Sequence, residues 1–67
     1  MKNTIVPIWE KYNLTIEEAA EYSNIGENKI RELIKDPNCK FVLSVGNKKH
    51  LIKRKKFEEF LLDRAAL

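Results

Sequence analysis

The chain has 67 residues, close to the lower limit at which a domain buries a self-sufficient core, so one domain spanning 1–67 is expected and a binding module is favoured over an enzyme. A hydrophobic content of 43% with only two glycines and two prolines indicates a globular fold, and no apolar run approaches the roughly 18 residues of a membrane span. Residues 1–4 lack the apolar core of a signal peptide, and the single cysteine cannot form an internal disulfide, so we expect a cytoplasmic protein.

The charge of the chain is distributed unevenly. Residues 1–26 carry two lysines against four glutamates, whereas residues 27–67 carry eleven basic side chains against six acidic ones. Within residues 46–56 there are six basic side chains and no acid. Such a concentrated field is typical of a protein that binds a polyanion, although a basic face that only contacts solvent is the alternative.

The first 13 residues are interpreted as a lead-in to the domain. Pro7 limits any strand here to an edge or an extended segment. Trp9 and Tyr12 lie outside the basic part of the chain, so we predict that they contribute to the core or cover it, and that they do not stack on nucleic-acid bases.

The first helix is predicted over residues 16–23. Thr15 and Glu18 have the spacing of a capping box, in which each side chain binds the backbone amide of the other residue. Leu14 precedes the cap and is placed to act as a hydrophobic staple. We therefore expect a well-defined helix start at Thr15.

A second helix is predicted from Glu27 to about Lys35. Residues 24–26 form a tight turn, in which Gly26 is expected to adopt a positive φ angle. The apolar side chains of the second helix recur at helical spacing, and Pro37 follows its end. Two short helices joined by a three-residue turn with a glycine are typical of a helix-turn-helix.

The hydrophobic period then changes from helical to alternating. Residues 41–45 and 48–52 are predicted to form a β-hairpin with Gly46 and Asn47 as a two-residue type II′ turn. A last helix is expected from about Lys53, with Phe57 among its buried residues. The predicted fold is therefore α+β: a small winged helix-turn-helix with two short helices, a β-hairpin wing and a C-terminal helix.

The sequence contains few groups that could support catalysis. His50 is the only histidine and stands among lysines, and Cys39 is interpreted as a partly buried structural thiol. Adjacent glutamates in a helix diverge, and no glycine-rich phosphate loop is present. We expect no enzymatic activity, no metal, no cofactor and no small-molecule ligand.

If the domain binds DNA, the second helix would enter the major groove. Asn28 carries an amide suited to adenine, and Arg31 carries a guanidinium suited to guanine or a phosphate. Lys29 and Lys35 are better placed for phosphates, and Glu32 is expected to pair with a neighbouring cation. An ordinary solvated helix face is the alternative for these positions.

The wing and the helix starts supply the remaining candidates. Asn47, Lys48 and Lys49 at the hairpin tip would reach a minor groove or its phosphates. Arg54, at the junction of strand and last helix, is expected to contact DNA, with Lys53, Lys55 and Lys56 as supporting charge. Thr15, at the start of the first helix, is a candidate phosphate site.

Several ordered runs resemble the excisionase family of MerR-like winged-helix DNA-binding domains. These runs are LTIEEAA at 14–20, IGENKIR at 25–31, VGN at 45–47, IKR at 52–54 and FEEFL at 57–61. The segments PIWE at 7–10 and GENK at 26–29 are similar to excisionases of conjugative transposons. The resemblance implies a recombination directionality factor that binds and bends double-stranded DNA at the ends of a mobile element. Its implied partner is a tyrosine-type integrase, which cleaves the strands itself.

Two alternatives remain open at this point. One is a small transcriptional regulator of the same fold. The other is a protein-interaction module, whose contact surface would use Tyr22, Phe41, residues 61–62 or Leu67. An integrase contact near the C-terminal end could also accompany DNA binding.

Overall fold

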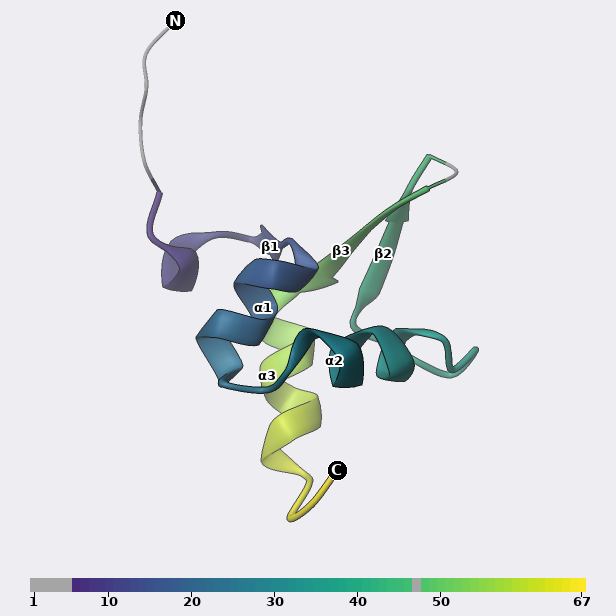
Figure 1. Ribbon diagram of the computed structural model, residues 1–67. Coiled ribbons are helices and arrows are strands. Elements are labelled where there is room, and N and C mark those ends of the chain that lie inside the picture. The colour runs from purple at the N-terminus through teal and green to yellow at the C-terminus, as the bar shows by residue number, and fades with distance from the viewer. Residues whose placement is uncertain (1–5, 47) are drawn as a thin grey trace, which may run out of the picture.

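The computed structural model describes residues 6–46 and 48–67 and has an α+β architecture. Three α-helices pack around a three-stranded antiparallel sheet, and two of the strands extend away from the helices as a hairpin (Figure 1). The elements in chain order are η1 (Ile8–Glu10), β1 (Asn13–Leu14), α1 (Ile16–Ser23), α2 (Glu27–Ile34), β2 (Val42–Val45), β3 (Lys49–Lys53) and α3 (Arg54–Leu62). The predicted order of helix-turn-helix, hairpin and last helix is confirmed.

The sheet contains one strand that was not predicted. This strand is β1. The strand order of the sheet is β1-β3-β2, and Ile52 of the central strand pairs with both Leu14 and Val42. The end of the lead-in thus adds a short strand to the hairpin. This pairing fixes the base of the wing to the segment that starts α1.

The prediction of a two-residue hairpin turn is wrong. The strand register pairs Val45 with Lys49, so three residues lie between the last paired positions. Gly46 has a φ of 68°, a value that glycine adopts without steric cost. Asn47, the second residue of the predicted turn, lies outside the described residues.

The turn between α1 and α2 also differs from the prediction. Asn24, not Gly26, takes the left-handed conformation, with a φ of 62° at the C-cap of α1. Asparagine tolerates this region better than other residues with a Cβ atom. Gly26 has a φ of −61° and serves as the N-cap of α2.

The capping box at the start of α1 is confirmed. The Thr15 hydroxyl accepts from the amide of Glu18 at 3.0 Å, and the Glu18 carboxylate accepts from the amide of Thr15 at 3.0 Å. Both amides would otherwise lack a partner in the first turn of the helix.

Replacing Thr15 with alanine is therefore expected to lower the free energy of unfolding by about 1 kcal/mol. For a domain of this size, the melting temperature should fall by roughly 4–8 °C, measurable by circular dichroism. Thr15→Ser is the matched control, because serine keeps the hydroxyl acceptor. Equal melting temperatures for the two variants would contradict a stabilising role for this cap.

One buried core holds the helices and the base of the wing together. The sheet contributes Leu14 and Ile52, and Phe41 directly precedes β2. The three helices contribute Ala19, Ile30 and Phe57. The Phe41 ring lies 5.0 Å from both Phe57 and Phe60, measured between ring centroids. Phe41 is only 2% exposed, so of the residues that the protein-interaction alternative offered as a contact surface, this one belongs to the core.

The prediction that Trp9 and Tyr12 belong to the core or cover it is wrong. Trp9 is 62% exposed and Tyr12 is 82% exposed. Ile8 instead packs against the core from η1. Successive residues of a 3₁₀ turn point about 120° apart, so burial of Ile8 directs its neighbour Trp9 outward.

Candidate nucleic-acid interface

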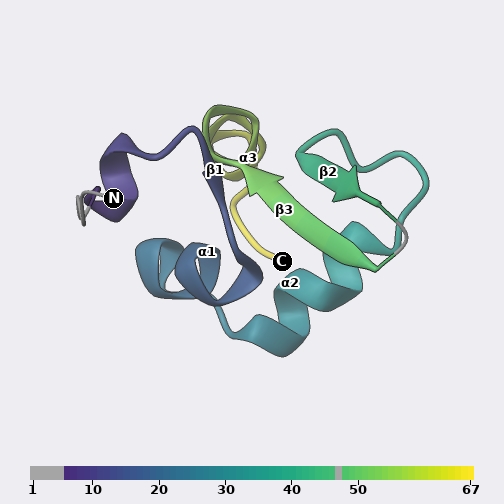
Figure 2. The ribbon, with the colours of Figure 1, turned by 90° about the horizontal axis from the view of Figure 1, so that it is seen from above.

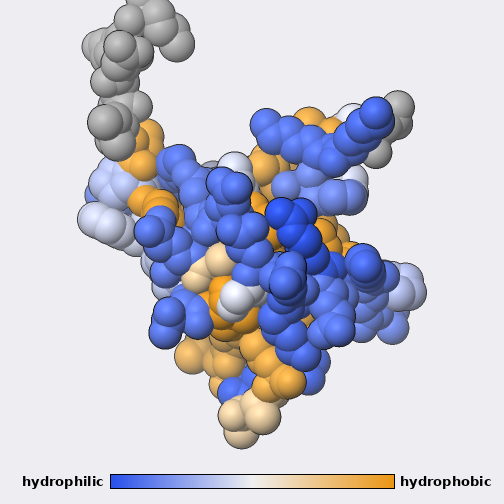
Figure 3. Space-filling view, viewed as in Figure 1, coloured by the Kyte–Doolittle hydropathy of each residue, from blue (hydrophilic) through white to orange (hydrophobic). Residues whose placement is uncertain are grey.

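The helix α2 and the wing formed by β2 and β3 lie on the same side of the molecule. In both figures, which share their horizontal axis, α2 and the wing lie to the right of α1 and η1 (Figures 1 and 2). The space-filling view shows hydrophilic side chains across α2 and on the wing, whereas apolar ones gather toward the end of α3 (Figure 3). One face thus presents an exposed helix next to an exposed hairpin, the two parts that a winged-helix domain uses on DNA.

The structure places the predicted base-reading residues on the outer side of α2. Ile30 is the buried residue of this helix, and the helix packs against α1. Asn28, Arg31 and Lys35 are exposed, and Lys29 is half-buried. These four side chains are accessible to a ligand, and their contact with DNA remains a prediction.

Of these four candidate residues, Lys29 and Arg31 already have acidic partners. Lys29 Nζ lies 3.1 Å from Glu32 Oε1, and Arg31 Nη2 lies 3.3 Å from Glu27 Oε1. The predicted pairing of Glu32 is confirmed. The role of Glu27 was not predicted, although its i,i+4 spacing to Arg31 is the signal that could have indicated it.

The wing presents cations without such partners. Lys48 and Lys49 are exposed, and no carboxylate among the described residues lies within ion-pair distance of either. His50 lies across the hairpin from Ser44, with its Nδ1 3.3 Å from the serine hydroxyl. The predicted contact through Asn47 falls outside the described residues.

Arg54 is held at the junction of β3 and α3, as predicted. Its side chain is only 16% exposed. Its Nε donates to the carbonyl of Lys11 at 2.8 Å, its Nη1 lies 3.1 Å from Glu58, and its amide donates to the carbonyl of Tyr12 at 3.3 Å. The guanidinium therefore joins the lead-in to α3 and has a structural role, and the predicted DNA contact of Arg54 stays a prediction.

Glu58, the ion-pair partner of Arg54, also forms a hydrogen bond with a residue of α1. The Tyr22 hydroxyl donates to the Glu58 carboxylate, and this hydrogen bond together with the guanidinium of Arg54 lowers the pKa of Glu58. The network thus links α1, α3 and the lead-in at the point where β3 ends. Lys53 is half-buried at the N-cap of α3, Lys55 is exposed, and Lys56 lies 3.7 Å from Glu59.

Replacing Arg54 with alanine is expected to lower the free energy of unfolding by about 1–3 kcal/mol, because charged hydrogen bonds to Lys11 and Glu58 are lost. Urea denaturation measures this change. Lys55→Ala, at the exposed neighbouring position, serves as the control and should leave stability nearly unchanged. Unaltered stability in Arg54→Ala would contradict the structural assignment.

The start of α1 is poorly suited to the predicted phosphate contact through Thr15. The Thr15 hydroxyl and the Glu18 carboxylate bind each other's backbone amides, as a phosphate would otherwise do. Lys11 binds the same carboxylate, which lowers the pKa of Glu18 and keeps a negative charge at this position. The capping box thus already occupies these two amides, and a phosphate contact at Thr15 stays a prediction.

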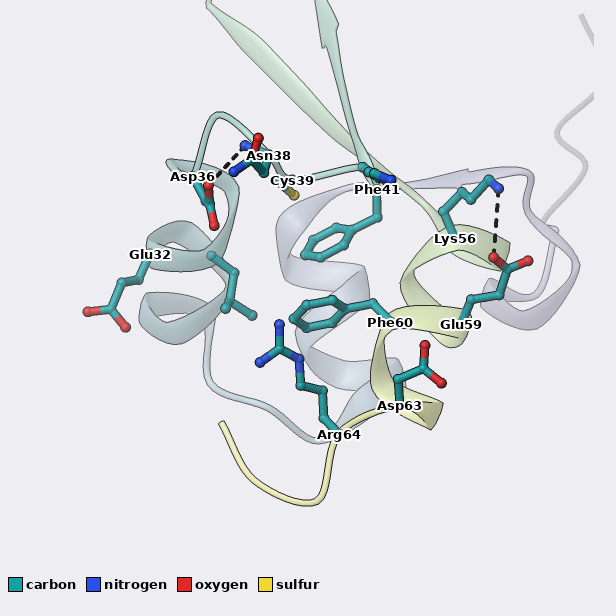
Figure 4. A pocket seen from close by; sticks show the side chains of 12 residues that line it. Glu32, Asp36, Asn38, Cys39, Phe41, Lys56, Glu59, Phe60, Asp63 and Arg64 are labelled. Carbon is teal, nitrogen blue, oxygen red and sulfur yellow. Dashed lines mark hydrogen bonds and ion pairs between the residues drawn. The ribbon is translucent and has the colours of Figure 1, made fainter.

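A hollow of about 540 Å³ lies between the end of α2 and α3 (Figure 4). Phe41 and Phe60 line it, and the Arg64 guanidinium stacks 4.5 Å from the centroid of the Phe60 ring. Its rim also carries four carboxylates: Glu32, Asp36, Glu59 and Asp63. The cations Lys40, Lys56 and Arg64 also line the hollow, so its charge is mixed and it is not a purely basic surface of the kind that attracts a phosphate backbone.

Nothing in the described part of the chain forms a group of three or more histidine, cysteine, aspartate or glutamate side chains that could hold a metal ion. Cys39 is a free, partly buried thiol beside the hollow, as predicted. Among the described residues, no helix has the length and apolar character that crossing a membrane requires.

The helix-turn-helix, the hairpin and the last helix define a small winged-helix domain of the α+β class. The sequence model of a family described as "Excisionase from transposon Tn916" matches residues 1–67. The excisionase from transposon Tn916 of Streptococcus agalactiae serotype V (strain ATCC BAA-611 / 2603 V/R) is 50% identical over 62 residues, which cover 91% of each chain. The chain belongs to the Tn916 excisionase family, and the resemblance noted in the sequence is confirmed.

Proposed function

We propose that this protein promotes excision of a mobile element by binding duplex DNA at the element's ends. Membership of the Tn916 excisionase family supports the excision-promoting role. The proposed way of binding DNA is supported by one observation. The helix α2 and the wing lie on the same side of the molecule and present exposed amide and basic side chains.

On this face, α2 occupies the major groove. Asn28 and Arg31 read base edges, with the amide suited to adenine and the guanidinium to guanine. Lys29 and Lys35 bind phosphates and fix the position of the helix. Arg54 supports this arrangement from the base of the wing and does not itself need to touch DNA.

The wing supplies the second contact, at the adjacent minor groove or its phosphates. Lys48 and Lys49 are exposed at its tip, and Asn47 is proposed to accompany them. A helix and a wing that bind neighbouring grooves favour a bent duplex, because added phosphate contacts offset a deformation that costs a few kcal/mol.

The strand chemistry belongs to a partner in this proposal. A tyrosine-type integrase cleaves and rejoins the DNA, while this protein organises the ends in the cytoplasm without an enzymatic activity, a cofactor or a small-molecule ligand of its own.

The test is an excision assay combined with a footprint on the element's ends. A plasmid that carries the two ends is incubated with the integrase, with and without this protein. We expect protection of specific segments near the ends and a clear increase in excised product. Absence of both protection and increased excision would contradict the proposal.

A transcriptional regulator of the same fold is the second candidate, because a protein bound near a promoter also blocks it. The shared helix and wing surface supports this role equally well. Protection of a promoter with unchanged excision would favour the regulator. A neighbouring recombinase gene would favour the excisionase.

A further inference from the structure

The helix proposed to read DNA carries its own counter-charges. Glu27 Oε1 lies 3.3 Å from Arg31, four residues later, and Glu32 Oε1 lies 3.1 Å from Lys29, three residues earlier. All four side chains reach solvent, with exposed fractions of 44% and 53% in the first pair and of 70% and 39% in the second. Both carboxylates therefore stand on the accessible surface of α2, among the groups that would meet a duplex.

The wing, by contrast, carries basic side chains without acidic ones. Residues 42–53, which span its two strands and the tip, carry three basic side chains, Lys48, Lys49 and Lys53, and no acid. Lys48 and Lys49 have no ion-pair partner among the described residues. By contrast, residues 27–35 carry three bases and two acids. One half of the proposed interface thus attracts any phosphate backbone, whereas the other half is nearly neutral.

We propose that Glu27 and Glu32 are specificity-determining residues: they neutralise Arg31 and Lys29 on non-cognate DNA and release them only where α2 is seated in a cognate groove, so that Arg31 meets a base edge and Lys29 a phosphate. This inference rests on the proposed function, in which α2 faces the major groove. It assigns the discrimination between cognate and non-cognate DNA to two acidic residues, which would be overlooked if only basic residues were considered as DNA contacts.

The physical basis is the weakness of exposed ion pairs. Such pairs exchange readily, so a guanine N7/O6 edge can draw Arg31 away from Glu27. The carboxylate of Glu32 can then accept from a cytosine amino group or remain on Lys29. On a duplex without suitable edges, both carboxylates instead face phosphates and repel them. Specificity is strengthened when the wrong partner is repelled as well as the right one bound.

The experiment compares the wild-type protein with the double variant Glu27→Gln/Glu32→Gln. The control is Glu17→Gln/Glu21→Gln, which removes two exposed carboxylates of α1 that form no ion pair among the described residues and so changes the net charge equally. Affinity is measured for a duplex from the element's end and for a random duplex of the same length, over a series of salt concentrations. Thermal unfolding of each variant verifies that the fold is retained.

We expect the α2 variant to bind random DNA roughly tenfold more tightly, with a salt dependence steeper by up to about two, because two cations become free for phosphates. Its affinity for the end duplex should change much less, so the ratio of specific to non-specific affinity falls by about tenfold. The control variant should alter both affinities by a similar, smaller factor. An unchanged ratio in the α2 variant, with the wild type still binding DNA, overturns this inference alone. If the wild type binds neither duplex, the proposed function fails as well.

Discussion

Replacing Phe57 with alanine is expected to remove most of the stability of the domain. Phe57 is fully buried at the start of α3, and its ring lies 5.0 Å from that of Phe41. A truncation of this kind costs about 3–5 kcal/mol. A domain of this length has a total stability of roughly 3–10 kcal/mol, so the loss approaches the whole. Urea denaturation followed by circular dichroism measures the change.

The control for this experiment is Leu62→Ala at the end of the same helix. Leu62 is 84% exposed, so its truncation should leave the urea midpoint almost unchanged. If Phe57→Ala unfolded at the same urea concentration as Leu62→Ala, the packing of α3 onto the wing base would not hold the fold together as the structure indicates.

Removing both tip lysines with Lys48→Ala/Lys49→Ala is expected to weaken binding to every duplex by a similar factor. The two ammonium groups are exposed at the tip and are proposed to neutralise phosphates, which carry no sequence information. For a wild type with about six phosphate contacts, the loss of two should change the slope of log affinity against log salt from about −5.4 to about −3.6. At physiological salt this corresponds to roughly 10- to 50-fold weaker binding.

Arg31→Ala is the informative comparison for the wing variant, because it tests the helix instead. The loss of a bidentate base contact should weaken binding to the end duplex by about 10- to 100-fold, with a much smaller effect on random DNA. The wing variant thus tests the phosphate contacts that position the protein on DNA, and Arg31→Ala tests a contact that reads the base sequence. Equal effects on both duplexes in both variants would contradict the proposed division between the wing and α2.

The local parts of the fold could be predicted from the sequence because their causes lie within a few residues. Thr15 and Glu18 form the capping box within one turn, and the bounds of α1 follow from it. The turn after α1 shows the limit of this approach, because Asn24 and Gly26 both suit a left-handed conformation and only the three-dimensional path selects Asn24.

The features that the sequence did not reveal depend on residues far apart in the chain. The strand β1 exists because Leu14 pairs with Ile52, and two residues are too few to show an alternating pattern. The hydrogen bonds from Arg54 to Lys11 and Tyr12 likewise span more than forty residues. The position of Arg54 within a basic run therefore indicated a possible DNA contact, but it did not reveal these structural hydrogen bonds.

The candidate DNA surface was predictable to the extent that it follows helix geometry. Burial of Ile30 fixes which side of α2 faces outward, so the exposure of Asn28 and Arg31 follows from their spacing. The ion pairs on the same helix follow from i,i+3 and i,i+4 spacing, although only that of Glu32 was anticipated. Which of these side chains meets a base depends on the DNA and does not follow from the chain alone.

Titration of ¹⁵N-labelled protein with a duplex from the element's end tests the proposed interface most directly. Amide resonances report contact residue by residue without altering the surface. We expect the largest shifts in α2 and in the wing near Lys48 and Lys49, with small shifts in η1 and on the exposed side of α1. Shifts concentrated around Trp9, Tyr12 or the end of α3, with α2 and the wing unchanged, would contradict DNA binding through the helix and wing.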